Sequence, residues 1–126
     1  MALHESAEMY LETIYQLSLS QHPVRSVDVA EALGYSRPSV SRAVGLLRQD
    51  GYLEMSDDGF LVLTDQGRST AAKIYERHNV LSAALIALGV DKETAAEDAC
   101  KIEHVISDKS LEAVRKHMRK RAEGTV

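Results

Sequence analysis

Two short helical patterns joined by a tight turn constrain the fold of this chain more than any other feature of its sequence. Apolar residues at helical spacing predict a first helix over residues 26–34, with Ser26 as its N-cap. Gly34-Tyr35-Ser36 then forms a turn, and its last residue caps a second predicted helix over residues 37–49. Pro38 suits the first turn of that helix, because a missing N–H costs nothing there. The sequence therefore predicts a helix-turn-helix.

A predicted β-hairpin follows the helix pair directly. Residues 52–55 and 60–63 have strand character, and Asp58-Gly59 between them is favoured in hairpin turns. A hairpin in this position makes the predicted unit a winged helix-turn-helix, which is a DNA-binding arrangement.

The rest of the chain predicts further helices and a mainly α-helical fold. Expected are a helix over residues 7–19 and one that Thr64 caps and that runs to about residue 78 or beyond it, into an apolar helical stretch over residues 79–88. A further helix that Asp91 caps contains Ala95, Ala99, Ile102 and Val105, and Ser107 caps a last one, with Leu111, Val114 and Met118 facing inward. We assign residues 1–64 to a winged helix-turn-helix DNA-binding domain and residues 65–126 to a helical metal-binding and dimerisation domain.

The second helix of the pair is expected to enter the major groove with its N-terminal residues foremost. Hydroxyl and guanidinium groups there can contact phosphates and base edges. The expected DNA-binding residues are Ser36, Arg37, Pro38, Ser39, Ser41 and Arg42. The alternative is that the serines only cap the helix and the arginines only solubilise it.

The net charge of −4 is unusual for a nucleic-acid-binding protein, but the charges are unevenly distributed. No acidic residue lies between Glu31 and Asp50, whereas three arginines do. A second basic run over residues 115–121 is interpreted as either a solvated helix face or a binding surface.

Composition places the chain in the cytoplasm. Cys100 is the only cysteine, so no internal disulfide can form and a reducing compartment is expected. No apolar run approaches the roughly 18 residues that a membrane span needs. The first ten residues carry His4, Glu5 and Glu8 and lack the layout of a signal peptide.

Cys100, Glu103 and His104 form the most distinctive cluster of the sequence. At helical spacing i, i+3 and i+4 these residues share one helix face, so a thiolate, a carboxylate and an imidazole can converge on one ion. That mixed set favours a transition metal over calcium or magnesium. Met9 and Glu12 share a face of the helix expected over residues 7–19, and His78 lies at the end of the helix that Thr64 caps.

Each of these residues also has a structural interpretation. Cys100 and Met9 can be core residues, and Glu12 and Glu103 can be solvated. His78 can be a favourable charge near a helix C-terminus.

The sequence resembles the diphtheria-toxin-repressor family of metal-dependent regulators over nearly its whole length. The resemblance is carried by Glu8-Met9-Tyr10-Leu11-Glu12-Thr13-Ile14-Tyr15, Ser36-Arg37-Pro38-Ser39-Val40-Ser41, Leu63-Thr64 with Gly67, Arg77-His78 and, most specifically, Asp98-Ala99-Cys100-Lys101-Ile102-Glu103-His104-Val105-Ile106-Ser107-Asp108. It implies a winged helix-turn-helix followed by a helical dimerisation region, and repression of metal-uptake genes when the ion is plentiful.

The resemblance also implies a ligand set. Met9, Cys100, Glu103 and His104 match the primary activating site of the iron-sensing branch. The manganese-sensing branch carries oxygen ligands in place of the two sulfurs. Sulfur suits Fe²⁺ better than Mn²⁺, so Fe²⁺ is the expected ion, with Mn²⁺, Co²⁺ or Ni²⁺ as substitutes.

The chain departs from the family pattern in several places. Ala96 and Ser82 stand where the iron-sensing members have ancillary ligands, whereas Glu12 matches a manganese-branch ligand and with His78 and Glu103 could hold a second ion. Arg42 replaces a glutamine that is common in the recognition helix. Residues 1–126 leave no room for the SH3-like domain of longer members, so a short form of the family without that domain is expected.

The predicted function is therefore a metal-activated repressor that binds operator DNA as a homodimer, with residues 80–88 as the expected interface. The alternative is a winged-helix regulator that responds to an organic effector, a protein partner or the redox state of the cysteine. An enzyme is not expected, because no nucleophile, base and orienting group form a set.

Overall fold

The computed structural model describes residues 5–20 and 23–124, and the chain divides into two compact units. The first unit extends to Ala72 and the second begins at Lys73, so the division falls within helix α4 (Asp65–Ala87). Each unit is described below on its own. Among the described residues, no helix is both long and apolar enough to cross a membrane.

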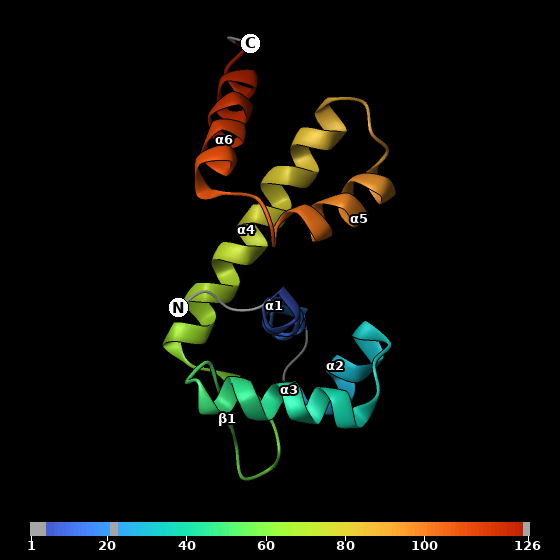
Figure 1. Cartoon of the computed structure of the whole chain (residues 1–126), viewed down its shortest axis with the longest axis vertical. Helices are drawn as coiled ribbons and strands as arrows, with labels where there is room; N and C mark the ends of the chain where they lie inside the picture. Colours follow the sequence, from blue (N-terminus) through green and yellow to red (C-terminus); the bar gives the residue numbers. More distant parts are fainter. Residues whose placement is uncertain (1–4, 21–22, 125–126) are drawn as a thin grey trace. The chain divides into compact units, whose positions relative to one another are not determined.

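The first unit is a winged helix-turn-helix (Figure 1). It contains α1 (Glu5–Ser20), α2 (Ser26–Leu33), α3 (Arg37–Gln49), β1 (Leu53–Met55), β2 (Leu61–Leu63) and the first part of α4. The strands pair antiparallel with Leu53 opposite Leu63, and Val24 adds a bridge to Leu61. One apolar core joins all these elements, and its largest fully buried side chains are Leu11, Ile14, Val24, Val29, Val40, Leu47 and Leu53.

Local hydrogen bonds set the ends of the helix pair. Gly34 ends α2 in the left-handed region, with φ of +69°, which glycine adopts without strain. The Ser36 hydroxyl caps α3 by accepting from the Ser39 N–H at 3.3 Å, as predicted. The predicted Ser26 cap is wrong. Arg25 is the N-cap, because the Asp28 carboxylate, as an ionised acceptor, binds the Arg25 N–H at 2.8 Å.

The start of α4 is tied to the segment after α3. The Thr64 hydroxyl accepts from the Gly67 N–H at 3.0 Å and donates to the Gly51 carbonyl at 2.7 Å, so Thr64 caps α4 as predicted. Gly67 lies so close to Tyr52 that a Cβ on it would overlap the Tyr52 carbonyl oxygen.

The second unit contains the remainder of α4, α5 (Lys92–Ile102) and α6 (Asp108–Ala122). Asp91 and Ser107 cap α5 and α6, as predicted, by accepting from Thr94 and Ser110. Its apolar core is small and consists of Leu81, Ala99 and Leu111 with Val80, Ile102 and Ile106 packed against them. Of the expected inward residues of α6, only Leu111 is buried, and Val114 and Met118 are half-buried.

One sequence prediction for this unit is made more definite, and one needs correction. The helix that Thr64 caps continues beyond His78 through the apolar stretch to Ala87, because no glycine or proline interrupts that segment. The helix that Asp91 caps ends at Ile102, so Val105 lies beyond it and is 74% exposed.

We predict opposite effects on stability for two glycine substitutions. Gly67→Ala should destabilise the protein by roughly 1–3 kcal/mol, because the Tyr52 backbone cannot yield as a flexible side chain would. Gly45→Ala is the matched control, because Gly45 lies inside α3 with nothing within 4 Å of an added Cβ. It should stabilise by about 0.5–1 kcal/mol. Urea denaturation measures both, and equal effects would contradict the packing at Gly67.

Candidate metal centre and recognition helix

Two carboxylates of the metal-ligand type are buried, and one of them lies on α1. Glu12 is 4% exposed, and the nearest hydrogen bond to its carboxylate comes from Gln16 Nε2 at a long 3.4 Å. Met9 precedes it by one helical turn and shares its face. A buried carboxylate costs several kcal/mol unless donors or a cation compensate it, so Glu12 is suited to a positive partner.

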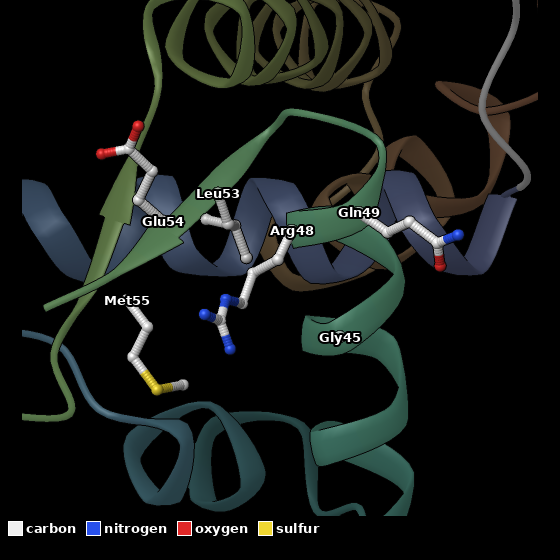
Figure 2. Close-up of a pocket in the computed structure, with 6 residues that line it drawn as sticks. All are labelled: Gly45, Arg48, Gln49, Leu53, Glu54 and Met55. Carbon is white, nitrogen blue, oxygen red and sulfur yellow. The ribbon is translucent and has the colours of Figure 1, made fainter.

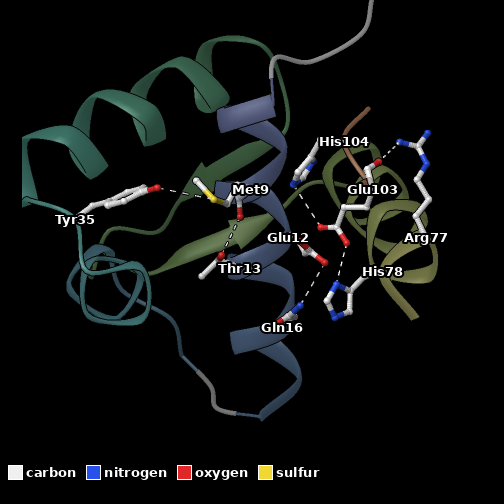
Figure 3. Close-up of polar contacts among 9 residues, drawn as sticks. All are labelled: Met9, Glu12, Thr13, Gln16, Tyr35, Arg77, His78, Glu103 and His104. Atoms are coloured by element: carbon white, nitrogen blue, oxygen red, sulfur yellow. Dashed lines mark hydrogen bonds and ion pairs between the residues drawn. The ribbon is translucent and has the colours of Figure 1, made fainter. Parts of the chain in front are cut away.

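The Met9 side chain contacts the turn that leads into the recognition helix (Figure 3). The Tyr35 hydroxyl donates to Met9 Sδ at 3.9 Å. The Tyr35 ring also packs edge-on against Tyr10, with ring centroids 5.9 Å apart. Burial, and then the nearby Tyr35, raises the pKa of the Tyr10 hydroxyl, which keeps it neutral. Sequence analysis did not identify Tyr35, because no local pattern connects positions 9 and 35.

The second buried carboxylate belongs to Glu103 and lies between two imidazoles of the second unit (Figure 3). His78 Nδ1 lies 2.9 Å from Glu103 Oε2, and His104 Nε2 lies 3.4 Å from Glu103 Oε1. The Glu103 side chain is fully buried, the His104 side chain is 2% exposed and that of His78 is 22% exposed. One carboxylate and two nitrogens thus meet at one point.

Arg77 fixes the backbone around Glu103. Its guanidinium donates to the Glu103 carbonyl at 3.4 Å and pairs with Asp108, at the start of α6, at 3.5 Å. Successive residues of α4 thus hold Glu103, since Arg77 binds its backbone and His78 binds its side chain. In the sequence, the only signal for this role of Arg77 is that it directly precedes His78.

Cys100 lies in the last turn of α5 and is half-buried. Glu103 is the C-cap with helical backbone angles, φ −58° and ψ −26°, and its N–H donates to the Ala99 carbonyl, so it still follows Cys100 by about one helical turn. His104 lies just beyond α5, in the turn that follows.

This donor set suits a transition ion. Imidazole nitrogen with carboxylate oxygen is a combination that Fe²⁺, Mn²⁺ and similar ions accept, and a thiolate would add preference for softer ions. Calcium and magnesium prefer oxygen ligands alone.

The expected DNA-binding residues lie at the N-terminal end of α3. Ser36, Arg37, Pro38, Ser41 and Arg42 are exposed, and Ser39 is half-buried. The Ser36 and Ser39 hydroxyls hydrogen-bond to each other at 2.9 Å, so capping engages them. The helix has no acidic residue, and its free N–H groups favour an anion such as phosphate.

A winged helix-turn-helix followed by a helical unit with buried metal-type ligands defines a class of transcription regulators, and comparison with known proteins specifies the family. Residues 2–61 match the family described as iron dependent repressor, N-terminal DNA binding domain. Residues 64–123 match the iron dependent repressor, metal binding and dimerisation domain. The chain belongs to this family of metal-dependent transcriptional repressors, whose members are not enzymes.

Individual relatives agree with this assignment. An uncharacterised helix-turn-helix regulator of Methanocaldococcus jannaschii is 32% identical over 120 residues, which cover 94% of this chain and 96% of that protein. The diphtheria toxin repressor of Corynebacterium glutamicum is 36% identical over 107 residues, which cover 84% of this chain. The chain spans about half the length of that repressor, 47%.

Solved structures show the same fold. The manganese regulator SloR superimposes with a TM-score of 0.80 at 27% identity, covering 94% of this chain and 55% of SloR. A manganese-dependent transcriptional repressor in complex with manganese gives the same score and identity over 95% of this chain and 53% of that one.

We predict that Arg77→Ala destabilises the metal-free protein by about 1 kcal/mol, because the Glu103 turn loses its donor and Asp108 its ion pair. Arg121→Ala, at an exposed position of α6, is the control and should change the unfolding free energy by less than about 0.5 kcal/mol. Chemical denaturation in the presence of chelator measures the difference. Equal values for the two variants would show that Arg77 does not hold the turn.

Proposed function

We propose that this protein is a metal-activated repressor that binds operator DNA as a homodimer and controls metal-uptake genes. The single observation that carries the proposal is the fully buried Glu103 carboxylate between His78 and His104. Family membership and the exposed, acid-free N-terminal end of α3 support it.

The proposed primary ligands are Met9, Cys100, Glu103 and His104, as the resemblance to the iron-sensing branch implies. Glu12 and His78 are proposed to form a second site with Glu103. The 2.9 Å approach of His78 to Glu103 supports the second set, and the burial of Glu12 agrees with it.

Fe²⁺ is the proposed physiological ion. A thioether and a thiolate favour it over Mn²⁺, which prefers oxygen. Glu12 and Glu103 provide oxygen ligands, so Mn²⁺ is the proposed substitute. Two similar structures are a manganese regulator and a manganese-dependent repressor in complex with manganese, which supports Mn²⁺ as the substitute.

Switching would depend on compensation of charge. A divalent ion, when bound, supplies two positive charges and a fixed coordination geometry. The protein carries a net charge of −4, and the Glu12 and Glu103 carboxylates are buried, so a bound cation would lower the repulsion of DNA phosphate and compensate the buried charge. A differential free energy of about 3 kcal/mol between the two states would change operator affinity roughly 150-fold.

Tyr35 supports a connection between the proposed ligands and the recognition helix. It contacts Met9 and Tyr10 of α1, and the next residue, Ser36, is the N-cap of α3. Ordering of α1 at Met9 would therefore also order the turn that positions the DNA-binding residues.

The homodimer proposal rests on exposed apolar residues of the second unit. Ile86 and Leu88, in the expected interface over residues 80–88, are 44% and 81% exposed. The unit's own core is small, so a partner that covers these residues would add apolar burial that the chain lacks alone.

We predict that anaerobic binding of the protein to its own upstream DNA requires metal. Fe²⁺ should tighten binding at least 100-fold over chelator, by the free energy given above, and Mn²⁺ should act less strongly. Fluorescence anisotropy measures the affinities. Binding with Mn²⁺ alone would reject Fe²⁺ as the activator. Equal binding in chelator would reject the metal switch and favour a regulator of the effector-responsive type.

We predict that cobalt(II) bound to the protein shows a thiolate charge-transfer band that Cys100→Ser abolishes, because the band requires a sulfur–metal bond. Met9→Leu should weaken cobalt binding about 10-fold and leave the thiolate band. Met118→Leu, at a half-buried methionine of α6, is the matched control and should change neither. A band that persists in Cys100→Ser would exclude the cysteine as a ligand.

A further inference from the structure

An open groove of about 610 Å³ lies between α3 and β1, wholly within the first unit (Figure 2). Gly45, Arg48 and Gln49 line it from α3, and Leu53, Glu54 and Met55 line it from β1. Figure 2 shows Arg48 and Met55 pointing toward the same space, while the Glu54 carboxylate points away from Arg48.

Gly45 has no internal structural reason to be a glycine. Its φ is not positive, it lies inside α3, and an added Cβ would meet nothing within 4 Å. A glycine inside a helix is less favourable than alanine, so this position weakens the recognition helix without improving the packing of the described residues. An external surface that approaches the helix backbone closely would account for it.

The charge around Gly45 indicates what that surface is. Ser41, Gly45 and Arg48 follow one another at i, i+4 and i+7 and so form one stripe of α3. The stripe leads from the proposed DNA-binding end of the helix into the groove. Arg48 is exposed and, within the described residues, forms no ion pair. A cation beside an open backbone suits a phosphate.

We propose that this groove receives one strand of the DNA sugar–phosphate backbone. Gly45 is the point of closest approach, and Arg48 contacts a phosphate. The inference rests on the proposed DNA-binding function and extends the contact surface beyond Arg42, to the junction of the recognition helix with the wing.

The test uses the full-length, metal-loaded protein and its own upstream DNA duplex, with affinity measured at several salt concentrations. Gly45→Ala should raise the denaturant midpoint yet weaken DNA binding, and Gly45→Leu should weaken it roughly tenfold or more because the added side chain blocks the approach. Arg48→Ala should reduce the slope of log K against log salt by about 0.9, the value for one phosphate contact. Arg48→Lys should restore the slope.

Ala113→Leu, at an exposed position of α6, is the control for adding a leucine to a helix surface and should leave binding unchanged. Wild-type affinity and slope in both Gly45→Leu and Arg48→Ala would overturn the inference and leave the proposed function intact. Wild-type protein that binds no DNA with any metal would overturn both. If Gly45→Leu changed the mass measured by light scattering but left DNA affinity unaltered, the groove would be a contact between subunits. That result would overturn the inference.

Discussion

The Glu103 carboxylate lies in the interior with an imidazole on either side, and three segments of the second unit meet at it. His78 comes from α4, Glu103 ends α5, and Arg77 joins the Glu103 carbonyl to Asp108 at the start of α6. A buried carboxylate is costly unless its partners are correctly placed, so these polar contacts fix how the segments meet. The apolar core of this unit is too small to impose that arrangement alone.

The two units are therefore organised by different forces. The first has a continuous apolar core through α1, α2, α3 and the hairpin, and the recognition helix packs into it through Val40, Val44 and Leu47. The second is organised around titratable groups that are also the donors a transition ion requires. Its geometry should respond to an ion, because the groups that hold the segments together are the groups that the ion would bind. A DNA-binding unit held by apolar packing, joined to a unit held by metal-type donors, is the arrangement that the proposed metal switch would use.

Two helical glycines differ in whether the fold of the chain itself requires them. Gly67 is required within the fold, because the Tyr52 backbone occupies the space of a side chain. Gly45 is not required within the fold, because the space beside it is open. Glycine weakens a helix at both positions, so each glycine needs a compensating reason. For Gly67 the reason is the packing of the folded chain itself, and for Gly45 it is the proposed close approach of DNA.

The sequence by itself determined the elements, because helix ends depend on residues within four positions of each other. Ser36, Thr64, Asp91 and Ser107 are caps of this kind, and the structure confirms all of them. The Ser26 prediction failed because the Asp28 carboxylate accepts from the Arg25 N–H, which places the N-cap one residue earlier. Only the tertiary structure decided which distant side chains meet. His78 reaches Glu103 across 25 positions, and Tyr35 reaches Met9 across 26. Such contacts depend on the path of the chain between them, which periodicity and capping do not specify.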